Sequence, residues 1–187
     1  MKSLCVYCGA STGDSPAFVS LAKALGTTLA EQNIRLVYGG GSVGLMGIIA
    51  DAALAANGEV LGIIPKSLRE KEVHHNGLTE LVIVGSMHER KAFMIEASDG
   101  FIALPGGFGT LDELFETLTW AQLGYHQKPV GVLNPDGYFD MLLAFLEVAT
   151  GHKLIKQGHL ELLLVVQNID RLLTRMTGYQ ASQLAKW

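Results

Sequence analysis

Short apolar runs alternate along the chain with longer segments whose apolar residues recur at helical spacing. Between positions 15 and 32, for example, Leu21, Leu25 and Leu29 fall on one stripe of a helix. The apolar runs between such segments are typical of buried strands. The pattern predicts strands over 4–8, 34–38, 59–64, 81–84, 101–104, 130–133 and 162–166, and helices over 15–32, 45–56, 86–97, 110–123, 138–150 and 169–176.

This alternation is typical of an α/β fold. Strands joined by helices form βαβ units, so the strands run parallel and the helices cover both faces of the sheet. The segment 66–79 is polar and irregular, and no linker, internal repeat or low-complexity stretch divides the sequence. We therefore expect a single nucleotide-binding domain over residues 1–187, built on a doubly wound, mostly parallel sheet, which suits a chain of this length.

Glycine-rich loops follow three of the predicted strands. The chain has 22 glycines, and the richest stretches are 9–13, 39–44 and 105–110. The carboxyl ends of parallel strands meet at one edge of the sheet, where open α/β folds bind their ligands. Each loop also precedes a predicted helix, whose N-terminus favours a phosphate. The alternative is that the glycines only make tight turns. That alternative is sufficient for one loop, but three loops at one edge favour a phosphorylated ligand.

The second loop also fits the spacing G-x-G-x-x-G through Gly39, Gly41 and Gly44. A dinucleotide-binding site further needs an acidic residue at the end of the next strand. That strand ends without one, and Glu59 lies at its start. The loops also lack the sequence G-x-x-x-x-G-K-[ST] of the Walker-type triphosphatases. The glycines therefore support neither an NAD site nor a triphosphatase.

A carboxylate follows the third glycine loop. Thr110 and Glu113 have the spacing of a capping box, which by itself explains Glu113 as a helix cap. Glu113 also lies one turn from a candidate phosphate loop, with Asp112 and Glu116 beside it. A carboxylate there can stabilise a developing cation or orient a water. From position alone, both interpretations are open.

A second capping box, Ser86 to Glu89, is followed directly by Arg90 and Lys91. Two cations near the start of a helix oppose its dipole, and Glu89 offsets only part of this. We expect an anion near them, because arginine binds phosphate through two hydrogen bonds. The alternative is that both long side chains extend into solvent.

Composition excludes several other classes of protein. With 49% hydrophobic and 17% charged residues the chain is not disordered, and a net charge of −4 without a basic stripe disfavours nucleic-acid binding. No apolar run reaches the roughly 18 residues of a membrane span. Cys5 and Cys8 lie three apart in a strand, so they face opposite sides as buried structural thiols. The adjacent His74 and His75 do not suggest a metal site. We expect a cytoplasmic protein without metal or cofactor.

Several segments together resemble the Lonely guy family, the cytokinin riboside 5′-monophosphate phosphoribohydrolases once called possible lysine decarboxylases. The two most specific are M-H-E-R-K at 87–91 and P-G-G-F-G-T-L-D-E at 105–113. The resemblance extends through 8–11, 38–47 and 119–124, and so covers nearly the whole chain. Phe108 stands where many members of the family have tyrosine.

The resemblance implies a Rossmann-like homodimer that hydrolyses the N-glycosidic bond of a nucleoside 5′-monophosphate, AMP or N6-prenyl-AMP. The products are a free base, cytokinin or adenine, and D-ribose 5-phosphate. Lysine decarboxylation and its pyridoxal cofactor do not belong to the family. The catalytic pair falls on Arg90 and Glu113. The family's substrate contacts fall on Glu72, Lys91, Gly106, Gly107, Gly109, Thr110 and Thr119, to which the other glycine loops add Ser11, Gly40, Gly41 and Gly44.

The implied reaction agrees with the residues. N-glycoside cleavage passes through an oxocarbenium-like sugar, which a carboxylate such as Glu113 can stabilise, by analogy with glycosidases. Arg90 would bind substrate and stabilise charge as the base departs. One rival is a non-catalytic carrier of a nucleotide or of the molybdenum cofactor, and another is a DNA-processing adaptor. The Arg90–Glu113 pair argues against the first, and the acidic balance against the second. Base preference, the part of the substrate that Arg90 contacts and the physiological role stay open.

Overall fold

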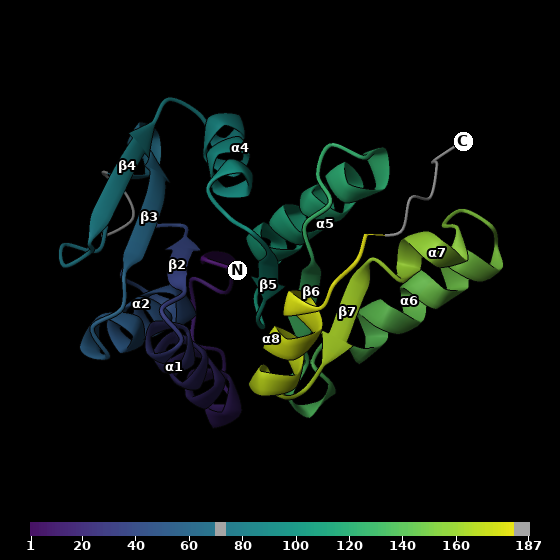
Figure 1. Cartoon of the computed structure of the whole chain (residues 1–187), viewed down its shortest axis with the longest axis horizontal. Coiled ribbons are helices and arrows are strands. Elements are labelled where there is room, and N and C mark those ends of the chain that lie inside the picture. Colours follow the sequence, from purple (N-terminus) through teal and green to yellow (C-terminus); the bar gives the residue numbers. More distant parts are fainter. Residues whose placement is uncertain (70–73, 182–187) are drawn as a thin grey trace.

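The chain folds around one parallel sheet, as a computed structural model that describes residues 1–69 and 74–181 shows (Figure 1). Within these residues the sheet has seven strands in the order β4-β3-β2-β1-β5-β6-β7, and each neighbouring pair runs parallel. The strands are β1 (Ser3–Tyr7), β2 (Arg35–Tyr38), β3 (Val60–Pro65), β4 (Glu80–Val84), β5 (Phe101–Ala103), β6 (Val130–Leu133) and β7 (Leu163–Val166).

Helices cover both faces of the sheet. The first face carries α1, α2 and α8, and the second carries α4, α5 and α6. No helix in the described part of the chain is long and apolar enough to cross a membrane. The helical elements are α1 (Pro16–Glu31), α2 (Gly44–Ala55), α3 (Lys66–Arg69), α4 (Met87–Glu96), α5 (Phe108–Leu123), the 3₁₀ turn η1 (Pro135–Gly137), α6 (Asp140–Gly151), α7 (Gln157–Leu160) and α8 (Ile169–Thr177).

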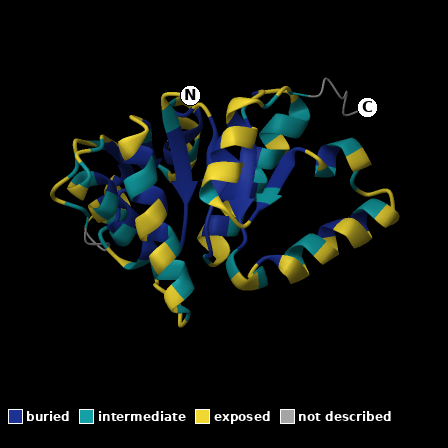
Figure 2. Cartoon of the chain, turned by 60° about the horizontal axis from the view of Figure 1, so that its bottom comes forward, coloured by how far each residue is buried: buried dark blue, intermediate teal, exposed yellow. Residues whose placement is uncertain are grey.

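The alternation of side chains along each strand divides the interior into two hydrophobic cores. In β1, Leu4 and Val6 pack in the core under α1, α2 and α8, whereas Cys5 and Tyr7 pack in the core under α4, α5 and α6. Figure 2 shows the strands buried through the centre of the molecule and the exposed residues on the outer sides of the helices. Cys5 and Cys8 are free, buried and in different cores, as the sequence predicts.

The order of the strands places one crevice at the middle of the sheet. The chain proceeds from β1 outward through β2, β3 and β4, and then returns to β5 on the other side of β1 before continuing to β6 and β7. This reversal makes the β1–β5 junction the topological switch point, and the carboxyl ends of the strands at such a point are where open α/β sheets bind ligands. The glycine-rich loops 9–13 and 105–107 follow these two strands directly.

The predicted α/β class and the seven predicted strands are confirmed, with ends that move by at most one residue. Two helices begin two residues away from their predicted starts. Helix α5 begins at Phe108 rather than at residue 110, and the segment predicted as helix from 138 starts only at Asp140, after a 3₁₀ turn. Both differences lie beside the switch point, where backbone turns rather than side-chain periodicity decide the structure.

Candidate active site

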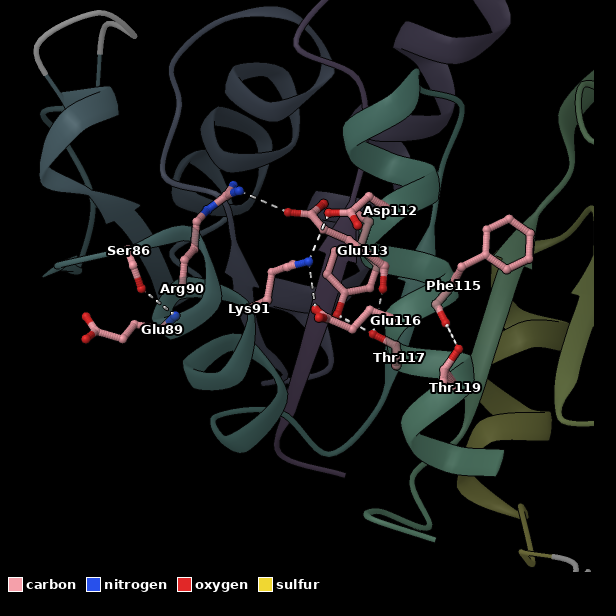
Figure 3. A network of polar contacts seen from close by, with 11 residues as sticks. Ser86, Glu89, Arg90, Lys91, Asp112, Glu113, Phe115, Glu116, Thr117 and Thr119 are labelled. Carbon is pink, nitrogen blue, oxygen red and sulfur yellow. Dashed lines mark hydrogen bonds and ion pairs between the residues drawn. The ribbon is translucent and has the colours of Figure 1, made fainter. Parts of the chain in front are cut away.

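A buried ion pair joins the helices α4 and α5. Arg90 Nη1 lies 3.1 Å from Glu113 Oε1, and each side chain is only 10% exposed. A second contact holds the guanidinium, since Arg90 Nε donates to the carbonyl oxygen of Ile63 at 3.0 Å. Figure 3 shows the two side chains reaching toward each other across the gap between their helices. The structure therefore brings together the two residues that the resemblance assigns to catalysis.

The arginine fits because the residue beside it is glycine. A Cβ on Gly39, at the end of β2, would overlap the guanidinium of Arg90. Gly40 and Gly44, in the same loop, have positive φ angles of 77° and 60°, a region that L side chains rarely adopt. Two glycines of the G-x-G-x-x-G spacing thus have a structural cause here: Gly39 makes room for Arg90, and Gly44 lets the loop turn.

Burial dominates the electrostatics of Glu113. Its pKa is raised from the usual 4.5 to about 7, chiefly because burial disfavours the charged form. The charge of Arg90 acts in the opposite direction, and that of Asp112 adds to the upward shift. A carboxylate with a pKa near neutrality can hold or release a proton at physiological pH, which is what a general acid or base requires.

Lys91 is also paired with carboxylates of α5. Its Nζ lies 3.0 Å from Asp112 Oδ2 and 3.1 Å from Glu116 Oε2 (Figure 3). Burial alone would lower the pKa of Lys91, but the two carboxylates outweigh it and the pKa is raised. The alternative that Arg90 and Lys91 extend into solvent is therefore wrong. The anions beside these two cations are the protein's own carboxylates.

Of the two predicted capping boxes, one is confirmed and one is wrong. Ser86 caps α4 and accepts from the backbone N–H of Glu89 at 3.1 Å, while Glu89 reaches back to the N–H of Gly85 at 2.6 Å. Helix α5, however, is capped by Gly107, without a side-chain hydrogen bond in the described structure. Thr110 lies within its first turn, and Glu113 turns to Arg90 instead. The capping explanation of Glu113 is thereby removed.

A cleft of about 520 Å³ lies at the switch point. Gly107, the N-cap residue of α5, forms part of its wall, and the leading N–H groups of that helix have no partner within the helix, as in any helix. A Cβ on Gly107 or Gly109 would meet nothing within 4 Å, so protein packing does not explain these glycines. The cleft is lined by Gly9, Ala10, Ser11, Thr12, Gly13, Asp14, Phe18, Leu45, Pro105, Gly106, Gly107 and Tyr138.

Arg90 and Glu113 do not line this cleft: Glu113 lies further along α5, and Arg90 meets it from α4. Glu113 follows Gly107 by six residues, which is about 9 Å at 1.5 Å per residue. A ribose phosphate with a contact at each end spans a distance of that order. The cleft and the ion pair are therefore close enough to act on the two ends of one ligand.

The other predicted site residues divide into three groups. Ser11 and Gly106 line the cleft, and Thr110 is buried with its hydroxyl beside Gly106. Gly40 and Gly41 are instead covered by the segment around His74: Gly40 O accepts from the N–H of residue 75, and Gly41 pairs with His74. Gly44 packs against loop 9–13. These three glycines serve the fold of the loop.

One predicted residue in the described part of the chain is not brought to the Arg90–Glu113 pair. Thr119 is exposed on α5, a further six residues beyond Glu113, and its hydroxyl donates to the carbonyl oxygen of Phe115 at 2.7 Å. It lines a separate, mainly apolar cavity of about 180 Å³ between α5 and the α6–α7 segment. Glu72 lies outside the described residues.

Tyr138 is a cleft residue that the pattern of the sequence placed only at the start of a predicted helix, over 138–150. It follows the turn N-P-D-G at 134–137, directly before α6, and its hydroxyl reaches the loop at Gly106. The signal in the sequence was the turn itself, because Asn-Pro and Asp-Gly mark a chain reversal rather than the start of a regular helix.

These features define a class of protein: a doubly wound α/β protein that places a glycine-lined cleft and a buried Arg–Glu pair at one edge of its sheet. The chain belongs to the family described as "Possible lysine decarboxylase", whose model matches residues 46–176. It is 45% identical over 179 residues to cytokinin riboside 5′-monophosphate phosphoribohydrolase LOG7 of Arabidopsis thaliana, covering 96% of this chain and 82% of that one. The enzyme LOG of Oryza sativa subsp. japonica is 44% identical, covering 95% and 74%.

Solved structures share the fold at low sequence identity. The molybdenum cofactor binding protein of Rippkaea orientalis superposes with a TM-score of 0.70 at 23% identity, covering 95% of this chain and 96% of that one. DNA processing protein A of Helicobacter pylori superposes with a TM-score of 0.58 at 17% identity, covering 95% and 81%. These likenesses confirm the Rossmann-like architecture and carry no argument about the ligand.

The raised pKa of Glu113 predicts how stability depends on pH. Between about pH 4.5 and pH 7 the folded chain keeps a proton on Glu113 that the unfolded chain has released. The free energy of unfolding therefore falls as pH rises through this window. In Glu113→Gln this pH-dependent contribution is absent. The free energy of unfolding of the variant minus that of the wild type should therefore rise by on the order of 1–3 kcal/mol as pH increases through the window.

Urea unfolding at a series of pH values measures this difference. Leu154→Ala, which changes an exposed apolar side chain, is the control, and its difference from the wild type should not vary with pH. A difference between Glu113→Gln and the wild type that stays constant across the window would contradict the raised pKa.

Proposed function

We propose that this chain is a nucleoside 5′-monophosphate phosphoribohydrolase. It hydrolyses the N-glycosidic bond of N6-modified adenosine 5′-monophosphates, releasing the cytokinin base and D-ribose 5-phosphate. The observation that carries the proposal is the buried Arg90–Glu113 pair next to a glycine-rich anion site. Relatives that share about 45% of their residues with this chain bear the name of the same activity.

In the proposed reaction, Glu113 acts at the sugar. The bond from C1′ to the base breaks, the base keeps the electron pair and takes up a proton, and C1′ acquires oxocarbenium character. The Glu113 carboxylate stabilises this charge and accepts a proton from the water that attacks C1′. Its pKa near 7 suits this role, because the group is ionised in part at neutral pH and takes up a proton readily.

Arg90 and the first turn of α5 act on the remainder of the substrate. Arg90 holds the carboxylate of Glu113 in place and adds positive charge for the departing base or the phosphate. The N–H groups of residues 107–110 bind the 5′-phosphate at the helix N-terminus, and Ser11 faces the same cleft from the loop after β1. Lys91 adds a cation on the same side of α5. Thr119 is given no part in this step, because its hydroxyl donates to Phe115 O and its side chain lines the separate cavity between α5 and the α6–α7 segment.

The carrier alternative explains less of the structure. A carrier needs a cleft for the nucleotide, which the switch point supplies, but has no use for a buried carboxylate with a raised pKa beside it. Burying such a pair is costly for the fold, and reactive sites are where such costs concentrate. The proposal needs no cofactor, since water, a carboxylate and an arginine are sufficient for the hydrolysis.

We further propose that the protein is a cytoplasmic homodimer acting through one nucleotide-binding domain per chain. Its two cysteines are free thiols, as in proteins of a reducing compartment. On α6, Met141, Phe145 and Val148 recur at intervals of four and three residues and are 84%, 64% and 57% exposed. An apolar stripe of this kind on a helix supports association with a second copy.

Product analysis tests the activity. Incubated separately with AMP and with N6-isopentenyl-AMP, the purified protein should release free base and ribose 5-phosphate in equal amounts, resolved by chromatography. The ratio of the two rates then gives the preference for the prenyl group. Binding of either nucleotide without release of base would favour the carrier.

Replacing the proposed catalytic carboxylate should abolish most turnover. In Glu113→Gln the amide oxygen still accepts from Arg90 but carries no charge and takes no proton, so we expect a fall in kcat of about 100-fold or more. Near-ultraviolet circular dichroism checks that the variant is folded. Glu147→Gln on the exposed side of α6 is the matched control and should keep full activity. Unchanged turnover in Glu113→Gln would leave the ion pair with a structural role only.

The apolar stripe predicts the mass in solution. Sedimentation equilibrium should give about twice the chain mass of 20.1 kDa for the wild type. Phe145→Glu places a charge in the stripe and should shift the mass toward one chain. Arg171→Glu, on α8 and therefore on the other face of the sheet, is the control and should leave the mass unchanged. A wild type with the mass of one chain would refute the dimer.

A further inference from the structure

The turn after β6 is built to hold one tyrosine in a fixed place. Asp136 and Gly137 both have positive φ angles, 51° and 71°, and reverse the chain sharply. The buried side chain of Asn134 stabilises this reversal. Its Nδ2 donates to Asp140 Oδ1 at 2.7 Å, and its Oδ1 accepts from the backbone N–H of Phe139 at 2.7 Å. The two hydrogen bonds fix the chain on both sides of Tyr138, because they join Asn134 before it to Phe139 and Asp140 after it.

Two aromatic contacts fix the ring of Tyr138. It packs edge-on against Phe18 of α1, with ring centroids 5.2 Å apart, and against the buried Phe139, at 4.9 Å. The ring is nevertheless 45% exposed and lines the cleft at the switch point. Its hydroxyl donates to the carbonyl oxygen of Gly106 at 2.8 Å. The tyrosine therefore joins the loop after β6 to the loop after β5.

The bond to Gly106 has a consequence for the next N–H group. In a planar trans peptide, the C=O of one residue and the N–H of the following residue point in opposite directions. Holding Gly106 O against Tyr138 thus fixes the direction of the N–H of Gly107, the capping residue of α5. A second bond, from Gly9 N–H to Pro105 O at 3.1 Å, fixes the preceding peptide.

The loop before α5 is rich in glycine, so it needs support from outside to keep one conformation. Residues 106, 107 and 109 are all glycine, and no side-chain cap holds the start of α5 within the described structure. A loop of this kind loses much conformational freedom when it is ordered around a ligand. A loop that is already held in its binding geometry avoids that loss and binds more tightly.

We propose that Tyr138 is a positioning residue for the anion site: through its hydroxyl it orients the loop 106–110 toward the phosphate of the ligand. The inference rests on the proposed function in so far as that function places the 5′-phosphate at this loop. It adds a residue outside the three glycine loops and outside the Arg90–Glu113 pair.

Tyr138→Phe is the decisive variant, because it removes only the hydroxyl and keeps both ring contacts. Its dissociation constants for ribose 5-phosphate and for adenosine are measured by calorimetry, without turnover. We expect the constant for ribose 5-phosphate to rise about 5- to 10-fold, the effect of one net hydrogen bond, and that for adenosine to stay unchanged. In steady-state kinetics with AMP, KM should rise while kcat changes little. Tyr125→Phe, at an exposed tyrosine after α5, is the control and should leave all values unchanged.

The outcomes separate this inference from the proposed reaction. Unchanged affinity for ribose 5-phosphate in Tyr138→Phe, or equal weakening of ribose 5-phosphate and adenosine, would overturn the positioning role while leaving hydrolysis intact. So would a wild type that binds adenosine but not ribose 5-phosphate. Conversely, a wild type that binds ribose 5-phosphate but releases no base from AMP would refute the hydrolase while the effect of the tyrosine persists.

Discussion

The candidate site depends on one buried ion pair between α4 and α5. Burying Arg90 and Glu113 removes two charges from water, a cost that the attraction between them offsets only when the geometry is good and other hydrogen bonds are made. The surrounding structure supplies both conditions: Ile63 O accepts from the guanidinium, and Gly39 leaves space for it. Strands β2 and β3 and helices α4 and α5 therefore all contribute to the surroundings of the pair. Position 39 must be glycine, because a side chain there would overlap Arg90.

The charges around the pair are unevenly distributed, and this explains the state of Glu113. Two cations, Arg90 and Lys91, face three carboxylates on one side of α5. Lys91 is shared between Asp112 and Glu116, so among the described residues the buried Glu113 is ion-paired with Arg90 alone, and the more distant charge of Lys91 adds a smaller effect. Its pKa rises despite that partner, because burial outweighs the charge of Arg90. The cluster carries a net negative charge when all its groups are ionised, which suits a substrate whose sugar becomes positive as its bond breaks.

The sequence predicted the elements well and the two helix starts at the switch point less well. Strands and helices follow from periodicity, which is set by burial, and burial is regular over most of this fold. The start of α5 was misplaced because Thr110 and Glu113 match a capping box, whereas the structure caps that helix with Gly107 and gives Glu113 to Arg90. Local spacing cannot show a partner that is distant in the sequence. For the same reason, sequence could not show that Gly39 makes room for Arg90 or that Tyr138 reaches Gly106.

The cleft and the ion pair have different origins in the structure. The cleft at the β1–β5 switch point follows from the order of the strands. Solved structures of a molybdenum cofactor binding protein and of a DNA processing protein share the fold at low sequence identity. The ion pair does not follow from strand order, because it requires an arginine in the first turns of α4, a glutamate two turns into α5 and a glycine after β2. A chain with this fold gains a crevice at the carboxyl ends of its strands from topology alone. What it does to the bound ligand depends on what α4 and α5 bring to the edge of that cleft.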